Sequence, residues 1–273
     1  MSGIARLAAA AAVVTLLVTP AAMAAQQSDQ DWLEDCMDHD HGRDAVFCEV
    51  RDVAVEATGR LEIEGGRNGG ASVRGEERAS VAATARIQAR GDTRGDARER
   101  AGAIRIVSSG GTLGAEGPSG GSWSVSFDVA VPRSYDLRLE ANNGPVSVRG
   151  VSGDIELRTR NGPVHLDDVG GDVRARTQNG PLRVRLSGSR WAGAGLDAET
   201  RNGPVYLEIP EGFDAELETG TRNGPFRTDV PLQVTLEGAM GPGGAREIRT
   251  RLGAGGPTVR AVTTNGPVVI ERR

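Results

Sequence analysis

The motif Asn-Gly-Pro occurs six times between Asn143 and the end of the chain, each time between short runs in which apolar and polar residues alternate. Alternation with a period of two is typical of β-strands that bury one face. The first three motifs are evenly spaced, and the later ones follow at longer intervals. Such self-similarity predicts a repeat architecture. The asparagines of the motif are Asn143, Asn161, Asn179, Asn202, Asn223 and Asn265.

Equivalent positions around the motif carry similar residues. Two residues before Asn stands a threonine in five of the six units, namely Thr159, Thr177, Thr200, Thr221 and Thr263. Each unit has an apolar face too small to bury itself, so stacking the units would bury a continuous core with strands about 4.8 Å apart. Asn and Gly tolerate positive φ at a tight corner, and Pro gives up one N–H there. We expect the Asn side chains, and the Thr hydroxyls, to hydrogen-bond up the stack.

These patterns predict an all-β fold, a single-domain parallel β-solenoid of stacked two-strand repeats with Asn-Gly-Pro corners. Antiparallel sheets are the alternative, because Asn-Gly is also a strong hairpin signal. The segment 46–135 is expected to follow the same plan, since "NGGASVRG" from Asn68 mirrors "NGPVSVRG" from Asn143. Residues 91–102 and 108–122 are expected as exposed loops, and no long helical stripe is visible after the first residues.

One solvent-facing position is charged in every unit. Taken in chain order, the charge at this position is mostly opposite to that of the unit before or after it. Opposite charges on adjacent strands favour one register over others. The last strand, which ends in "VVIERR", would lie at an exposed edge of the stack, where its charges disfavour pairing with another copy. The column reads Arg138, Glu156, Arg174, Asp197, Glu218 and Arg260.

The N-terminal region divides into two parts before the repeat domain of residues 46–273. Residues 1–25 have the three parts of a secretory signal peptide, with an A-x-A site at 22–24. Residues 26–45 form an acidic, irregular segment, in which Cys36 is expected to form a disulfide with Cys48. A metal site is the alternative for that segment, because two Asp and two His, at positions 38–41, lie between the cysteines, although without a standard ligand spacing. The mature chain is therefore expected to be periplasmic or secreted, with no membrane span.

The stretch from "SWSVSFDVAVP" through "LRLEANNGPVSVRGVSGD" resembles the bacterial toastrack family of β-strand-repeat, adhesin-like domains, whose function is not defined. The resemblance covers the chain from about Val50 to its end, and its signs are the "VSFDVAVP" strand, the "L-x-L-x-x-x-N-G" pattern and the "V-x-G-D" corner. It implies an exported or envelope-attached fold without shared catalytic residues. The family more often follows Asn-Gly with an acidic or β-branched residue, where this chain has Pro.

The residues indicate a binding protein more than an enzyme, and no catalytic, cofactor or metal site is expected. A net charge of −5 and 3% aromatic residues argue against nucleic acid as a partner. Arg160, Gln178, Arg201 and Arg222, one residue before each Asn, form a candidate face for an envelope protein or an acidic polymer. The oligomeric state is left open.

Two other functions are kept as alternatives. One is a polysaccharide-degrading β-helix enzyme that would use Asp167 or Asp168, although arginine neighbours make a carboxylate a poor proton donor. The other is an envelope-stress sensory domain. His165 is expected to be a solvated surface residue, and Trp191 to anchor an inserted loop or to contact a partner.

Overall fold

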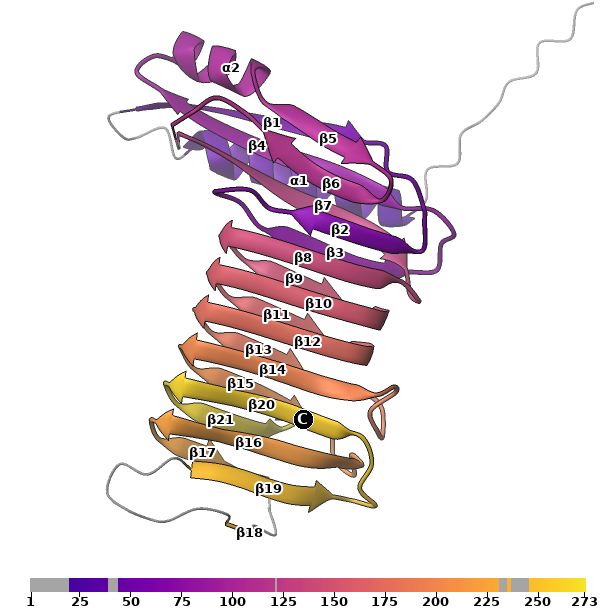
Figure 1. Ribbon diagram of the computed structural model, residues 1–273. Helices are drawn as coiled ribbons and strands as arrows, with labels where there is room; N and C mark the ends of the chain where they lie inside the picture. Colours follow the sequence, from indigo (N-terminus) through magenta and orange to yellow (C-terminus); the bar gives the residue numbers. More distant parts are fainter. Residues whose placement is uncertain (1–19, 39–43, 121, 231–234, 237–245) are drawn as a thin grey trace, which may run out of the picture.

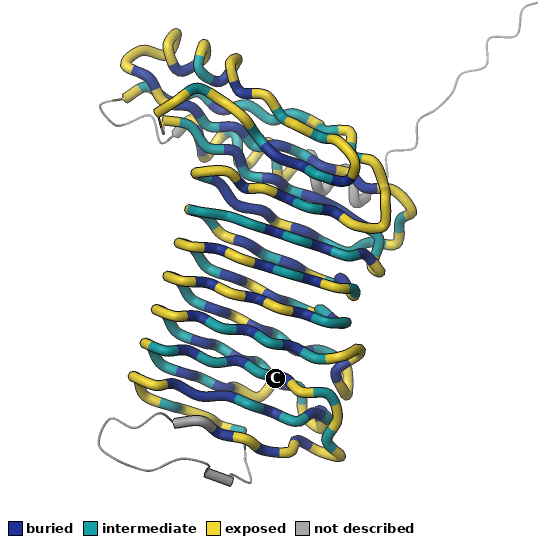
Figure 2. The backbone as a smooth tube through the Cα atoms, in the orientation of Figure 1, coloured by how far each residue is buried: buried dark blue, intermediate teal, exposed yellow. Residues whose placement is uncertain are grey.

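The computed structural model describes residues 20–38, 44–120, 122–230, 235–236 and 246–273. Two large mixed β-sheets face each other, and side chains from both inner faces form one hydrophobic core. Figure 1 shows the strands of the two sheets stacked along the length of the molecule. Buried and exposed residues alternate along them (Figure 2), as the period of two in the sequence predicts. The predicted all-β class is confirmed.

Six units of the chain, here called rungs, each give one strand to each sheet and pass from one sheet to the other at Asn-Gly-Pro. Equivalent strands of adjacent rungs pair in parallel, with equivalent residues in register. The rungs are β8 (Asp136–Asn143) with β9 (Val146–Arg149), β10 (Ser152–Asn161) with β11 (Val164–Asp167), β12 (Gly170–Asn179) with β13 (Leu182–Arg185), β14 (Gly195–Asn202) with β15 (Val205–Ile209), β16 (Ala215–Asn223) with β17 (Phe226–Thr228), and β20 (Thr258–Asn265) with β21 (Val268–Arg272).

The spatial order of the rungs differs from their order in the chain. Strand β20 lies between β14 and β16, and β21 lies between β15 and β17. Arg260 therefore stands between Asp197 and Glu218, which would face each other if the rungs followed the chain. Opposite charges alternate strictly in this arrangement, and opposite charges on paired strands stabilise the sheet. The expectation that the last strand lies at an edge was wrong, because β21 is inside its sheet (Figure 1).

Antiparallel strands extend the stack at both ends, so neither sheet is purely parallel. The expectation that residues 46–135 follow the repeat plan is right for β2 and β3, which are joined at Asn68, and wrong for the antiparallel pairs β1–β4 and β5–β6. These strands are β1 (Ala45–Val53), β2 (Arg60–Glu64), β3 (Ala71–Glu76), β4 (Ala82–Gly91), β5 (Arg105–Ser109), β6 (Thr112–Glu116), β7 (Trp123–Pro132), β18 (Thr235–Leu236) and β19 (Arg246–Leu252).

Three segments expected to be irregular are ordered. Helix α1 (Pro20–Asp38) occupies much of the acidic segment, and helix α2 (Arg94–Gly102) replaces the first expected loop. Thr93 and Asp96 close a capping box at the start of α2, a signal that was present in the sequence. The second expected loop, 108–122, contains the end of β5, the turn and all of β6 in the hairpin β5–β6, with Gly110 and Gly111 at positive φ in the turn.

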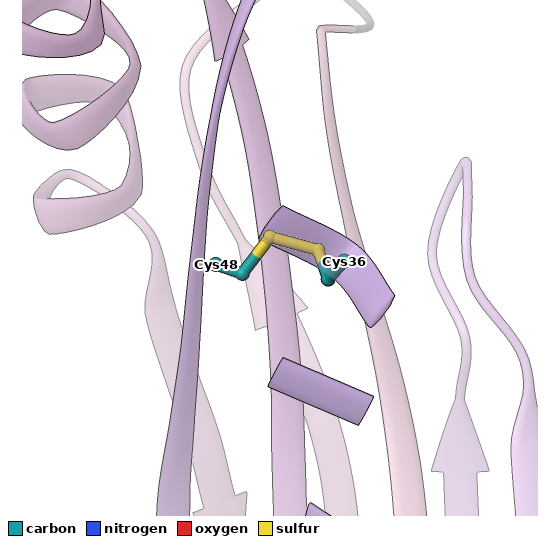
Figure 3. Close-up of a disulfide and its surroundings, with 2 residues drawn as sticks. All are labelled: Cys36 and Cys48. Carbon is teal, nitrogen blue, oxygen red and sulfur yellow. A yellow bond between two sulfur atoms is a disulfide. The ribbon is translucent and has the colours of Figure 1, made fainter. Parts of the chain in front are cut away.

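Helix α1 is attached to β1 by the disulfide between Cys36 and Cys48, which confirms the predicted pair (Figure 3). The two Cα atoms are 6.4 Å apart, and both cysteines are buried with Val46. On the adjacent strand β4, Arg86 forms an ion pair with Asp29 of the helix at 2.8 Å and lies over the ring of Trp32. A disulfide is typical of proteins that fold outside the reducing cytosol.

The expected signal peptide and the alternative metal site lie partly outside the residues that the structure describes. The expected signal peptide covers residues 1–19, which lie outside the described residues, and the start of α1. The alternative metal site includes His39, Asp40 and His41, which also lie outside them. Among the residues that are described, no group of three or more potential ligands could hold a metal ion. Neither of the helices that the structure describes is long and apolar enough to cross a membrane.

Replacing both cysteines by alanine is expected to release α1 from β1 and to lower the free energy of unfolding by about 3 kcal/mol, because a short closed loop is lost from the unfolded chain. Thermal unfolding of the wild type with and without reductant, followed by circular dichroism, would measure this. The double variant is the control, since its transition should not respond to reductant. An equal transition temperature for both proteins in the absence of reductant would contradict the expectation.

Candidate binding surface

The Asn-Gly-Pro corners are joined by hydrogen bonds from each rung to the next. The side-chain Nδ2 of Asn179 donates to Oδ1 of Asn161 at 2.7 Å, and the same bond recurs along the whole ladder, from Asn143 to Asn223. The ladder also continues to Asn68 at 3.3 Å. Each Asn between the two ends of the ladder thus uses one N–H and one lone pair within it.

The threonines do not bond to one another, in contrast to the expectation. Each Thr hydroxyl instead donates to the carbonyl oxygen of a corner glycine on the adjacent rung, as Thr200 does to Gly180 at 2.9 Å. Thr159, Thr177, Thr221 and Thr263 do the same. Buried hydroxyl groups need such partners, so these residues belong to the structure of the corner.

The backbone of the corner explains why Pro follows Gly. The N–H of Gly180 donates to the carbonyl of Asn202, and the N–H of Leu182 donates to the carbonyl of Pro204. Both partners lie on the next rung, and the residue between these two donors is a proline, which has no N–H to satisfy. The same pair of bonds recurs at the other corners except that of Gly224, which belongs to the last rung in the spatial order.

The corner glycines are required by close approach of the rungs, and the expected positive φ at Asn is absent. A Cβ atom on Gly180 would lie 2.1 Å from the carbonyl oxygen of Gly162, and similar contacts recur at every corner. The φ angle of Gly180 is 157°, close to extended backbone. Among the described residues other than glycine, Asp168 alone has a positive φ.

The outer face of the second sheet, to which β8, β10 and β12 belong, carries charged columns whose arginines are paired. Arg176 and Arg260 contact the carboxylate of Asp197 at 2.7 and 2.6 Å. Burial raises the pKa of Asp197, but the bonds from these two guanidinium groups outweigh it and hold the pKa below its usual value. Other pairs on this face are Arg138–Glu140, Arg158–Glu156 and Arg174–Asp172.

The column beside the corner differs, because its arginines are unpaired. Within the described part of the chain, no carboxylate forms an ion pair with Arg160, Arg201 or Arg222, and all three are exposed. Because β20 is inserted, Thr264 also belongs to this column, between Arg201 and Arg222. We call the five residues the arginine stripe. In order along the stack they are Arg160, Gln178, Arg201, Thr264 and Arg222.

A hollow of about 560 Å³ lies where the arginine stripe meets the shorter strand β2. Its lining includes Arg158, Arg160 and Gln178 together with Glu64 and Glu140. Glu140 is paired with Arg138 at 2.8 Å, whereas Glu64 forms no ion pair within the described part of the chain. The stripe therefore has an acidic boundary at its β8 end. Anions are favoured along the arginines and disfavoured beyond this boundary.

The carboxylates considered for catalysis are both engaged by neighbours. Asp167 lies 3.0 Å from Arg149 and 3.6 Å from Arg185, as its position in the stack predicts. Asp168 follows the end of β11, where its side chain accepts a hydrogen bond from Ser187.

Two further residues are placed as the sequence suggested. Trp191 is buried and donates to the carbonyl of Gly171 at 3.0 Å, so it anchors its loop. His165 lies on the outer face, where partial loss of hydration by its ring, together with the charge of Arg183, lowers its pKa.

One surface contact was not found from the sequence. The guanidinium group of Arg183 lies 4.6 Å from the ring centre of Tyr206, on the outer face of the first sheet. The two residues occupy the same column of adjacent rungs, so the register could have indicated the contact. The surface of Arg183 lies on the opposite side of the molecule from the arginine stripe.

No protein-family model and no curated protein matches the chain. Among solved structures, a candidate cell adhesion protein from Clostridium sporogenes is 8% identical, with a TM-score of 0.42 over 83% of this chain and 100% of the other. A candidate adhesin from Bacteroides fragilis is 10% identical, with a TM-score of 0.36 over 83% and 97%. One from Parabacteroides distasonis is 6% identical, with a TM-score of 0.32 over 84% and 97%. Structural neighbours of this chain thus include candidate bacterial adhesins, the class of domain that its sequence resembles.

Proposed function

We propose that the protein is an exported, non-enzymatic β-solenoid that serves as an adhesin-like binding scaffold in the cell envelope. Parallel stacking of the six rungs supports the description as a solenoid. The disulfide supports a location in the periplasm or outside the cell. Catalysis is left out of the proposal because Asp167 and Asp168, the carboxylates singled out for it, are held by neighbouring side chains.

The observation that carries the proposal is the unpaired charge of the arginine stripe. Arginines of the neighbouring columns contact carboxylates of this chain, whereas the described residues supply none to Arg160, Arg201 and Arg222. An exposed guanidinium group offers a planar fork of donors that fits carboxylate and phosphate groups. A partner with anionic groups would complete these contacts, so the stripe is the proposed binding surface.

A photoreactive residue at position 178 should capture the partner in cells. The variant Arg160→Glu/Arg201→Glu is expected to lower capture by more than about tenfold, because each reversal replaces an attraction by a repulsion. Arg183→Glu/Arg227→Glu is the matched control, since it makes the same change in net charge on the opposite sheet. Equal capture by the wild type and by the first variant would contradict the proposal.

A further inference from the structure

We propose that the ligand of the arginine stripe is an extended linear polyanion with one anionic group per two repeating units, such as an acidic polysaccharide with one carboxylate per disaccharide. This inference rests on the proposed function and adds the chemical class of the ligand. The inference is based on the spacing of groups on this surface. Arginines recur at every second rung, and the neutral Asn side chains recur at every rung.

The charges recur at every second rung. Gln178 separates Arg160 from Arg201, and Thr264 separates Arg201 from Arg222. With parallel strands about 4.8 Å apart, the guanidinium groups repeat at about 10 Å along the stack. This regularity depends on the inserted rung, because in chain order Arg201 and Arg222 would be on adjacent rungs.

The neutral groups recur at every rung. On the five rungs from Asn161 to Asn223, each exposed Asn has a second Nδ2 hydrogen and a second Oδ1 lone pair beyond those that the ladder uses. An extended β-linked pyranose chain advances about one rung per sugar, so each sugar would meet one amide. A carboxylate on every second sugar would then meet an arginine each time.

The surroundings fix where such a polymer would lie. Columns farther from the corner are neutralised by their own ion pairs, such as Arg176 with Asp197, so they do not compete for its charges. Glu64 lines the hollow, forms no ion pair within the described part of the chain, and repels anions at the β8 end. The expected footprint is therefore the five rungs from Arg160 to Arg222, in line with the stack axis.

The test uses three polymers at equal carboxylate or phosphate concentration: hyaluronan with one carboxylate per disaccharide, polygalacturonate with one per sugar, and linear polyphosphate. The wild type is expected to bind hyaluronan most tightly. In Gln178→Arg/Thr264→Arg the cations repeat at every rung, so affinity for polygalacturonate should rise by about tenfold and the order of preference should reverse. Binding should also become more sensitive to salt, because more ion contacts form. Arg183→Glu/Arg227→Glu should leave all three affinities unchanged.

The possible results separate this inference from the proposed function. Binding of all polymers in proportion to charge density would overturn the spacing argument, while the loss of binding in Arg160→Glu/Arg201→Glu would still support the stripe. Capture of a protein at position 178 without binding of any polymer would overturn the polysaccharide class and leave the proposed function standing. Absence of both polymer binding and capture would overturn both.

Discussion

A chain that ends at Leu252 is expected to lose two rungs of the stack, although only the residues of one are removed. The deletion removes β20 and β21, whose Val259, Ala261, Val268 and Ile270 are fully buried. Their loss would cost on the order of 5 kcal/mol of hydrophobic stabilisation. The rung of β16 and β17 would also lose its partner, because it pairs with β20 and β21 and not with β14 and β15.

Direct docking of β16 on β14 is disfavoured in such a chain. It would bring Glu218 opposite Asp197, and like charges on paired strands are destabilising. Limited proteolysis should therefore cut the truncated chain between residues 210 and 252, and hydrogen exchange of β16 should be fast. The matched variant carries Glu218→Arg in the same truncated chain and should partly restore protection of β16. Full protection of β16 without that substitution would show that the inserted rung is not needed for its docking.

The substitution Gly180→Ala is expected to lower the free energy of unfolding by about 3 kcal/mol, the range of overpacking in a close-packed interior. Its Cβ would meet the carbonyl oxygen of Gly162 at 2.1 Å and the carbonyl carbon at 2.5 Å. These are backbone atoms of the neighbouring rung, so relief requires the rungs to move apart. Such movement would weaken the bonds from Thr177 to the Gly162 carbonyl and from Asn179 to Asn161.

Chemical denaturation of the two alanine variants would measure this effect. Gly102→Ala at the end of α2 is the control, because no atom lies within 4 Å of its added Cβ and its φ is not positive. Alanine there should leave stability unchanged or slightly raised. Equal stability of both variants would show that the corners can widen at little cost and that glycine is not required by close approach.

The strands, their buried faces and the Asn-Gly-Pro corners could be predicted from the sequence, because every rung has apolar residues at the same inward-facing positions. Leu157 and Ala198 are buried at equivalent places, as the period of two requires. The order of the rungs was missed, although the charge column contained the signal: Asp197 and Glu218 are adjacent in chain order, and inserting Arg260 between them removes that conflict. Pairing in a stack is non-local, so neighbours in sequence need not be neighbours in space.

The helices and the details of the candidate site were harder to read. Helix α2 buries only Ala97 and Ala101, so it has no apolar stripe, and its capping box was its one clear signal. The arginines of the stripe could be named from their position before Asn. Their lack of partners could not be read from the sequence, because it depends on which carboxylates the register places nearby. The spacing between Arg201 and Arg222 depends on Thr264, which lies between them only because β20 pairs with both β14 and β16.

The inserted rung also has a consequence for how the protein is made. A chain grows from its N-terminus, and in a stack each rung can dock as soon as the previous one has formed. Rungs from β8 to β15 can follow that course, but β16 and β17 must wait until residues up to 272 have emerged, because their partner strands β20 and β21 follow them in the chain. Until then β14 and β15 have open edges, the kind of surface that chaperones and proteases recognise. Docking of β20 on β14 and of β21 on β15 covers these edges and ends that exposure.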